Sequence, residues 1–216
     1  MPYRETSQVR ERKTARRERL LRAVWELVGE RGFEQVRMVD VAARAGLATG
    51  TVYRYFGSRG ELFAAVFQRA TALEVEHVRQ ALADTSGTAA DGVEAALRTF
   101  ARRAMRAPVL AWSLMAEPVD PRVEQARLVY RRSYARLFQT AIERGIGESV
   151  FPPQPAGLSA NAVVGALAEA LAGPLAPGRD VDHQAGAVQA IALESMIDTV
   201  VRFCMQGLTG TMRTVK

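Results

Sequence analysis

MVDVAARAGLATGTVYRYFGSR, residues 38–59, is the stretch of this sequence that decides the fold. Two helices can cross steeply through a short turn only where small side chains line the contact and the turn residue adopts a positive φ at little cost. Ala42 and Gly46 meet these two requirements. The stretch therefore predicts a helix-turn-helix over about residues 37–56, with the second helix at about residues 48–55.

The predicted pair of helices has an apolar side and a polar side. The apolar positions that we expect to be buried are Val41, Leu47, Val52 and Phe56. The opposite side is rich in hydrogen-bond donors and aromatic edges, a composition that suits a DNA groove. We predict base contacts from Thr49, Gly50, Thr51 and Arg54, and phosphate contacts from Arg37, Tyr53, Tyr55 and Arg59.

The alternative for this stretch is an ordinary helical hairpin whose small residues serve packing alone. The run as a whole is more specific, because the small residue, the turn glycine, the buried valine, Tyr-x-Tyr-Phe and Ser58-Arg59 sit at fixed offsets. In these offsets it resembles the TetR family of bacterial transcriptional regulators, whose signature reads roughly Ile-Ala, Ala-Gly-Val, Gly-Thr-Leu-Tyr, Tyr/His-Phe and Ser-Lys. The resemblance is dense over residues 14–65 and thin beyond them. It implies a DNA-binding domain followed by a helical domain for an effector and for dimerisation.

One position departs from the family pattern. Family members usually have Thr or Ser as the cap of the first helix of the motif, where this chain has Arg37 or Met38. The loss of such a cap costs on the order of 1 kcal/mol. We therefore expect this helix to depend more on packing through Val41 and Ala42, and we expect Arg37 to take over a phosphate contact.

The excess positive charge is confined to the N-terminal part of the chain. Residues 1–60 hold 13 Lys or Arg against 7 Asp or Glu, whereas residues 61–216 hold 16 of each sign. A solvated basic surface would aid solubility, but it gives no reason for this segregation. A polyanionic partner for the first sixty residues does give one. We expect that partner to be a double-stranded DNA operator.

Composition limits the remaining possibilities. The chain of 216 residues is 48% hydrophobic and 24% charged, which is typical of a soluble globular protein. We identify no apolar run near the roughly 20 residues that span a bilayer, and no apolar core of a signal peptide. The single cysteine, Cys204, excludes an internal disulfide framework and fits a reducing compartment. We therefore expect a cytoplasmic protein without membrane contacts.

Helical periodicity runs through the whole chain, and no segment alternates like a strand. We expect an all-α protein of about nine helices, with a basic arm over residues 1–13, a helix-turn-helix domain over 14–60, and an effector-binding and dimerisation domain over 61–216. Gly32 should end the first helix in a left-handed conformation, and Ser58 and Glu61 should form a capping box at the start of the fourth. The predicted helices cover about residues 14–31, 37–45, 48–55, 58–83, 91–106, 108–116, 121–144, 158–175 and 182–208.

The last two predicted helices, 158–175 and 182–208, are poor in charge and rich in small residues. Residues 158–175 hold one ionisable side chain, Glu169, and residues 184–201 hold two, Glu194 and Asp198. A helix that is apolar on most faces must be covered on most faces, and a chain of this size hardly encloses both. We expect them to form a four-helix interface in a homodimer, as the resemblance also implies. A well-buried monomeric core is the alternative.

Large aromatic and methionine side chains recur at helical spacing in the middle of the chain. Such side chains suit a cavity for an apolar or amphipathic small molecule, and they suit a filled core equally well. The resemblance favours the cavity. The predicted lining residues are Phe100, Met105, Trp112, Met115, Tyr130, Tyr134 and Phe138.

Nothing in the sequence favours catalysis, a cofactor or a metal. His77 and His183 are isolated from other metal ligands, and Cys204 has no evident base partner. We therefore expect a transcriptional regulator that is not an enzyme, in the simplest case a ligand-responsive repressor that binds a palindromic operator as a dimer. Two alternatives stay open: a DNA-binding regulator without an effector, and an all-helical enzyme.

Overall fold

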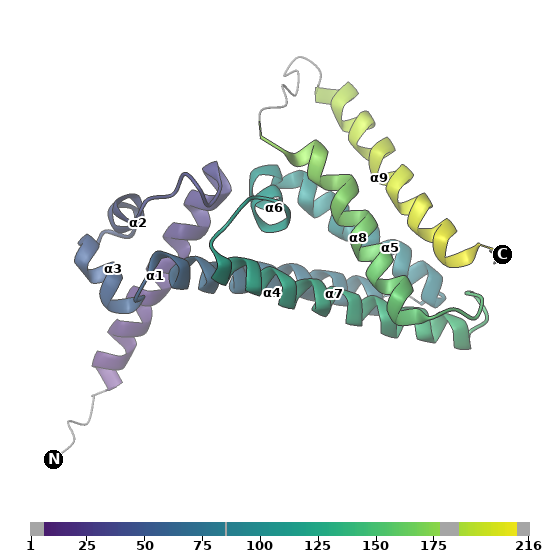
Figure 1. Cartoon of the computed structure of the whole chain (residues 1–216), viewed down its shortest axis with the longest axis horizontal. Helices are drawn as coiled ribbons and strands as arrows, with labels where there is room; N and C mark the ends of the chain where they lie inside the picture. Colours follow the sequence, from purple (N-terminus) through teal and green to yellow (C-terminus); the bar gives the residue numbers. More distant parts are fainter. Residues whose placement is uncertain (1–6, 85, 178–185, 211–216) are drawn as a thin grey trace.

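The computed structural model describes residues 7–84, 86–177 and 186–210, with side chains described from residue 8 onward and, in the last segment, from residue 192 onward. These residues form helices and no strand (Figure 1), so the all-α prediction is confirmed. The helices are α1 (Ser7–Arg31), α2 (Met38–Ala45), α3 (Thr49–Tyr55), α4 (Arg59–Ala83), α5 (Ala89–Arg106), α6 (Pro108–Met115), α7 (Pro121–Gly147), α8 (Ala156–Leu175) and α9 (Gly186–Thr209).

Helices α2 and α3 form the predicted helix-turn-helix at one end of the molecule, and α1 packs against α2 there (Figure 1). Two glycines end helices in the left-handed conformation, as predicted: Gly32 with a φ of +82° and Gly46 with a φ of +64°. Glycine adopts this conformation without the steric penalty that other residues incur. The four predicted apolar positions pack on one core, with Val41, Val52 and Phe56 buried and Leu47 partly buried.

The start of α2 is stabilised by an acidic side chain that the sequence analysis did not consider. Asp40 accepts a long hydrogen bond from the backbone N–H of Arg37 at 3.4 Å and pairs with the guanidinium of Arg31 at 2.8 Å. The guanidinium of Arg37 also lies 3.3 Å from Asp40. The hydrogen bond from the side chain of Arg37 is the main reason why the pKa of Asp40 is lowered. These contacts offset part of the missing hydroxyl cap.

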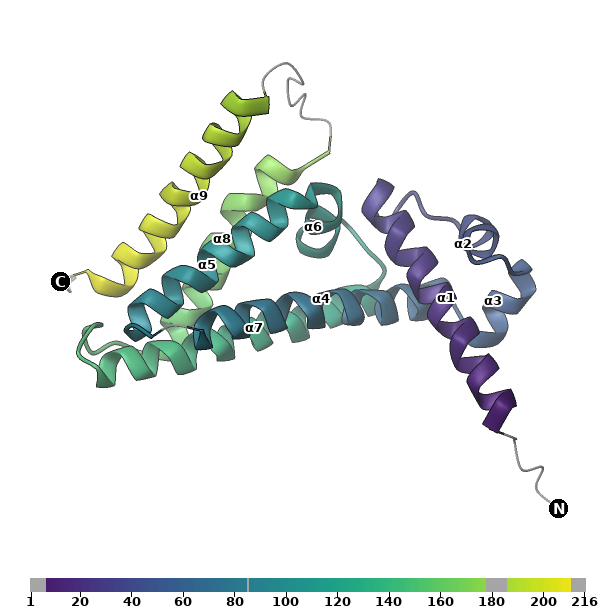
Figure 2. The same cartoon turned by 180° about the vertical axis from the view of Figure 1, so that it is seen from behind.

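The long helices α4 and α7 lie side by side and connect the two ends of the molecule (Figure 2). Their N-terminal parts complete the core of the helix-turn-helix, because Leu62 and Val66 of α4 and Val123 of α7 pack in the same cluster as Val24 of α1. This core therefore crosses residue 60, where we placed a domain boundary. The division into domains stays a prediction. A second core joins the C-terminal parts of α4 and α7 to α5, α8 and α9.

Helices α8 and α9 pack against each other at the end of the molecule far from α1 (Figure 1). The two acidic residues of α9 face α5, where Asp198 pairs with Arg98 and Glu194 pairs with Arg102 at 3.0 Å. These ion pairs fasten α9 to its own chain. Elsewhere on the two helices large apolar side chains are left in solvent, since Leu158 is 70% and Phe203 66% exposed.

Helix α8, with 20 residues, has the length and composition of a helix that crosses a membrane, and it is only partly buried. The expectation that no apolar run approaches this length is therefore wrong for Ala156–Leu175. Alanine and leucine make the helix apolar, and Glu169 is its only charged residue. In this structure it packs against α5, α6, α7 and α9.

The helix boundaries differ from the prediction mainly at the N-terminus. Helix α1 begins at Ser7, so residues 7–13, which we assigned to an arm, are helical. Helix α5 begins two residues earlier than predicted, and α7 ends three residues later. Residues 1–6 of the predicted arm and residues 182–185 of the last predicted helix lie outside the described residues.

One of the two hydrogen bonds of the capping box predicted at the start of α4 is present. The hydroxyl of Ser58 accepts the N–H of Glu61 at 3.1 Å. The carboxylate of Glu61, however, accepts the N–H of Gly57 at 2.9 Å and not that of Ser58. The reciprocal half of the prediction is wrong, because the carboxylate bonds the amide one residue before the cap.

Candidate nucleic-acid interface and cavity

Helix α3 presents its polar residues on the side opposite to the core. Val52 is fully buried, whereas Gly50, Tyr53 and Arg54 are exposed at the spacing that places residues on one helix face. Tyr53 is 49% exposed. The partly buried members of the predicted set are Thr49, Thr51 and Tyr55. Six of the eight predicted DNA contacts thus lie on this one helix, and their role stays a prediction.

The two predicted phosphate contacts outside α3 already have partners within the chain. Arg37 keeps 75% of its side chain exposed beside an acidic neighbour on α2. Arg59 donates from Nη2 to the carbonyls of Phe33 at 2.8 Å and Glu34 at 3.2 Å, and its guanidinium lies 4.7 Å from the ring centroid of Phe63. Arg59 therefore fastens α4 to the turn between α1 and α2, and its predicted phosphate contact stays a prediction.

A basic face that we did not single out runs along the N-terminal half of α1. Arg12, Arg16 and Arg17 are exposed there. The guanidinium of Arg17 lies 5.2 Å from the ring centroid of Phe56, the residue that follows α3. This contact places Arg17 next to the C-terminal end of α3. The excess of positive charge in the sequence indicates this region. The predicted helix began at about Thr14, however, so Arg12 was assigned to the arm, whereas in the structure it belongs to α1.

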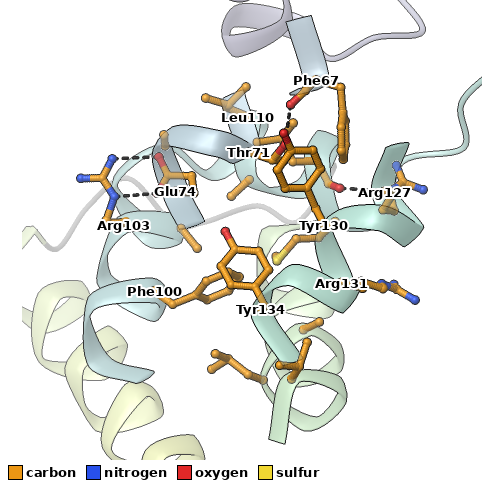
Figure 3. A pocket seen from close by; sticks show the side chains of 18 of the residues that line it. Phe67, Thr71, Glu74, Phe100, Arg103, Leu110, Arg127, Tyr130, Arg131 and Tyr134 are labelled. Carbon is orange, nitrogen blue, oxygen red and sulfur yellow. Dashed lines mark hydrogen bonds and ion pairs between the residues drawn. The ribbon is translucent and has the colours of Figure 1, made fainter. Parts of the chain in front are cut away.

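A cavity of about 100 Å³ lies among α4, α5, α6, α7 and α8 (Figure 3). Five of the seven predicted lining residues surround it. These are Phe100, Met115, Tyr130, Tyr134 and Phe138. The other two, Met105 and Trp112, pack partly buried against the second core and do not reach the cavity. The binding role of the whole set stays a prediction.

The two tyrosines of the cavity differ in their hydrogen bonds. Tyr130 donates to the backbone carbonyl of Gln68 at 2.8 Å. The hydroxyl of Tyr134 points into the cavity on the side where Glu74 lies (Figure 3), and among the described residues it has no hydrogen-bond partner. Its ring stands edge-on to Phe100 with centroids 5.5 Å apart. Burial raises the pKa of Tyr134 above that of a solvated tyrosine.

Four charged residues also line the cavity, although only aromatic and methionine side chains were predicted there. Glu74 and Arg103 form a bidentate ion pair on one wall, with N–O distances of 2.6 and 2.8 Å. Arg127 and Arg131 lie on α7 (Figure 3), on the helix face that also carries the two tyrosines. Arg127 lies three residues before Tyr130, and Arg131 lies three residues before Tyr134, and this spacing is the signal that would have found them.

A second cavity of about 450 Å³ adjoins the first between α6, α7 and α8. It reaches Asn161 and Glu169 on the exposed side of α8. The five residues that line both cavities are Met115, Arg127, Arg131, Val164 and Ala168. An aromatic inner chamber is therefore continuous with a charged outer one, and Arg127 and Arg131 stand where they meet.

The chemistry of a metal site or a nucleophile finds no further support in the described part of the chain. No group of three or more His, Cys, Asp and Glu lies close enough there to hold a metal ion, and His183 falls outside it. Cys204 is 3% exposed. Burial raises the pKa of its thiol, which disfavours the reactive thiolate.

The helix-turn-helix is similar in sequence to proteins of known class. Residues 20–66 match the family described as bacterial regulatory proteins, tetR family. The chain is 41% identical over 71 residues to the transcriptional activator FasR of Mycolicibacterium smegmatis, and 44% identical over 54 residues to the transcriptional repressor KstR of Rhodococcus jostii. These matches cover 33% and 25% of this chain, and 32% and 26% of the two relatives. The chain thus matches a third or less of each relative's length.

The fold as a whole is similar to solved structures over nearly its full length. One of them is the transcriptional regulator FadR of Bacillus subtilis in complex with stearoyl-CoA, with a TM-score of 0.67 and 15% sequence identity. The match covers 88% of this chain and 98% of that one. At this identity the likeness establishes the fold, while the sequence relationship rests on the helix-turn-helix.

Proposed function

We propose that this chain, which belongs to the TetR family of bacterial regulatory proteins, is a cytoplasmic transcriptional regulator that binds a palindromic operator as a homodimer and responds to a small molecule. The observation that carries the proposal is α3, whose exposed Gly50, Tyr53 and Arg54 stand on a buried scaffold. A helix of this kind enters the major groove of DNA with its polar side chains. We propose repression as the mode of control, because occupation of an operator is enough to block transcription.

The proposed dimer forms through α8 and α9. Helix-turn-helix proteins read two half-sites about one turn of DNA apart, so a symmetric dimer supplies the second recognition helix. Leu158 and Phe203 are exposed on these two helices, and the acidic side chains of α9 are turned to α5. An apolar surface of this kind favours association with a second copy.

The proposed effector is an apolar or amphipathic molecule that enters the inner cavity. The cavity of about 100 Å³ is smaller than the roughly 300–1,000 Å³ of common ligand pockets, so a ligand must also use the outer cavity of about 450 Å³. The hydroxyl of Tyr134, which has no hydrogen-bond partner among the described residues, would bond a polar group of that ligand. FadR of B. subtilis, which shares the fold, was solved with stearoyl-CoA, an amphipathic ligand.

In the proposed mechanism, the effector and DNA prefer different arrangements of the same chain. Helices α4 and α7 connect the cavity with the helix-turn-helix, since each lines the cavity and contributes to the N-terminal core. A ligand that prefers an arrangement with wrongly spaced recognition helices must weaken DNA binding by the same coupling free energy.

The small volume of the inner cavity, about 100 Å³, favours one alternative function, a DNA-binding regulator that needs no effector.

Selection from a pool of random duplexes tests the first part of the proposal. The full-length protein should enrich a palindrome with half-sites about 10 base pairs apart, centre to centre. Enrichment of no sequence would contradict it. A thermal-shift screen of amphipathic compounds then tests the second part, because a compound that binds only the folded state raises the melting temperature. If no stabilising compound releases the selected duplex, the regulator without an effector is the correct alternative.

A further inference from the structure

A buried carboxylate connects the cavity-bearing helices to the turn between α1 and α2. Glu117, in the α6–α7 loop (residues 116–120), is 2% exposed. Its two oxygens accept the backbone N–H groups of Phe33 and Glu34, both at 2.8 Å. A Cβ at Gly32 would lie 2.8 Å from this carboxylate, so glycine permits the approach. A carboxylate out of water requires such compensation, and consecutive amides provide it.

Arg127 holds the other side of the same loop. It is 7% exposed, and it donates from Nε to the carbonyl of Leu114 at 3.0 Å and from Nη2 to those of Ser113 at 3.2 Å and Glu117 at 2.8 Å. The first two carbonyls belong to the last turn of α6, where helical carbonyls lack partners within the helix. Arg127 therefore fixes the end of α6 together with the residue that carries the buried carboxylate.

The same guanidinium is accessible to a ligand, because Arg127 lines both cavities. A guanidinium has five N–H groups. Three of those on Arg127 serve the carbonyls, and one serves the carboxylate of Glu124. One N–H is left over, so a ligand group that accepts two hydrogen bonds from Arg127, as a carboxylate does, must compete for a donor that now serves Glu124 or the α6–α7 loop.

We infer that Arg127 is the positioning residue through which occupation of the cavity reaches the helix-turn-helix. The inference rests on the proposed function and specifies its regulation. Arg127 sets the position of Glu117, and Glu117 sets the turn from which α2 and α3 start. Arg59 holds the carbonyls of the same turn from α4. When the cavity is filled and Arg127 is drawn away, the turn keeps only this second hold, and the recognition helices lose their fixed spacing.

Hydrogen exchange at the amides of Phe33 and Glu34 measures this connection in the full-length protein without DNA. Arg127→Met should raise exchange at both amides roughly tenfold to a hundredfold, the loss expected for hydrogen bonds to a charged group. The amides of α9, such as that of Cys204, serve as the internal reference. Arg131→Met is the matched control, since Arg131 lines the same cavities and is exposed, without a bond to the loop.

Two further variants separate positioning from a general loss of structure. Glu117→Gln removes the acceptor charge, and Arg127→Met added to it should raise exchange at the two amides no further. Arg127→Lys keeps the charge and gives an intermediate rise if Arg127→Met does not fold. Additive effects, an equal rise in α9, or no rise in either Arg127 variant would overturn the inference.

Occupation itself is tested with a filled cavity. Ala168→Phe places a ring from α8 into the space that Arg127 lines. It should raise exchange at Phe33 and Glu34 in the natural chain and add nothing in the Arg127→Met background. An unchanged rate in the natural chain would overturn the inference. DNA takes no part in these measurements, so such a failure leaves the proposed function standing, whereas a failed duplex selection would refute that function alone.

Discussion

Gly60 and Asp120 lie so close together that a Cβ on Gly60 would be 2.7 Å from Oδ1 of Asp120. Gly60 is in the first turn of α4, and Asp120 caps α7 by accepting the N–H of Arg122 at 2.9 Å. Arg122 donates in turn to the hydroxyl of Ser58 at 2.8 Å. The starts of α4 and α7 thus form one joint beside the helix-turn-helix. The φ of Gly60 is not positive, so the backbone conformation does not call for glycine. Glycine is required at this position because a Cβ would collide with Asp120.

Gly60→Ala should destabilise the fold. Alanine favours a helix by up to about 1 kcal/mol over glycine, but overpacking at a close contact costs roughly 1–3 kcal/mol, so a net loss is expected in urea unfolding. Gly50→Ala is the control, because a Cβ there meets nothing within 4 Å. Asp120→Ala should restore part of the loss in the Gly60→Ala background. Equal effects of the two glycine substitutions would contradict the account of the joint.

Phe203→Glu tests the proposed dimer. Phe203 is 66% exposed on α9, and an unpaired charge buried in an interface costs several kcal/mol. Sedimentation should then show monomers at concentrations where the natural chain is dimeric. Leu73→Glu provides the control, because Leu73 is 51% exposed on α4. If Phe203→Glu leaves the dimer intact, the interface lies elsewhere.

Tyr130 and Tyr134 form a matched pair on α7. Tyr130→Phe removes a hydrogen bond to the carbonyl of Gln68 and should lower the free energy of unfolding by about 1 kcal/mol. Tyr134→Phe removes the cavity hydroxyl, which has no hydrogen-bond partner among the described residues, so it should leave stability unchanged or raise it. Urea denaturation of both variants decides the question. A loss in Tyr134→Phe as large as that in Tyr130→Phe would mean that the cavity hydroxyl is bonded.

Stability above pH 8 should depend on Cys204. Burial raises the pKa of its thiol in the folded chain, so the folded state keeps a proton that the unfolded state releases above its own pKa of about 8.5. The free energy of unfolding must therefore fall as the pH rises through this range. Urea unfolding at several pH values should show a smaller fall in Cys204→Ala. Identical slopes would show that the thiol is not buried in solution.

The parts of the fold that the sequence predicts are those set by local residues. Gly32 and Gly46 end helices in the left-handed conformation because glycine tolerates it, and this needs no distant partner. The role of Glu117 is not predictable in this way, since its partners Phe33 and Glu34 lie more than 80 positions away in sequence. No periodicity encodes such a contact.

The cavity illustrates a second limit. Helical spacing correctly groups Tyr130 and Tyr134 with Phe138 on one face of α7. It does not determine which neighbouring helix covers a face, so Met105 and Trp112 were grouped with the cavity although they pack on the second core. Arg103, Arg127 and Arg131 line the cavity but were not predicted to do so, because charged residues are not expected on the apolar face of a helix.

The central claim is that α3 recognises the DNA sequence. The most direct test measures how much Arg54→Ala weakens the affinity of the protein for the selected operator and for a random duplex, both at one salt concentration. Loss of a base contact should weaken operator binding by about 1–3 kcal/mol, roughly tenfold to over a hundredfold, and should barely change binding to the random duplex. Arg136→Ala, an equal change of charge at an exposed position of α7, should leave both affinities unaltered. Equal losses on the two duplexes in Arg54→Ala would contradict the claim that α3 reads the DNA sequence.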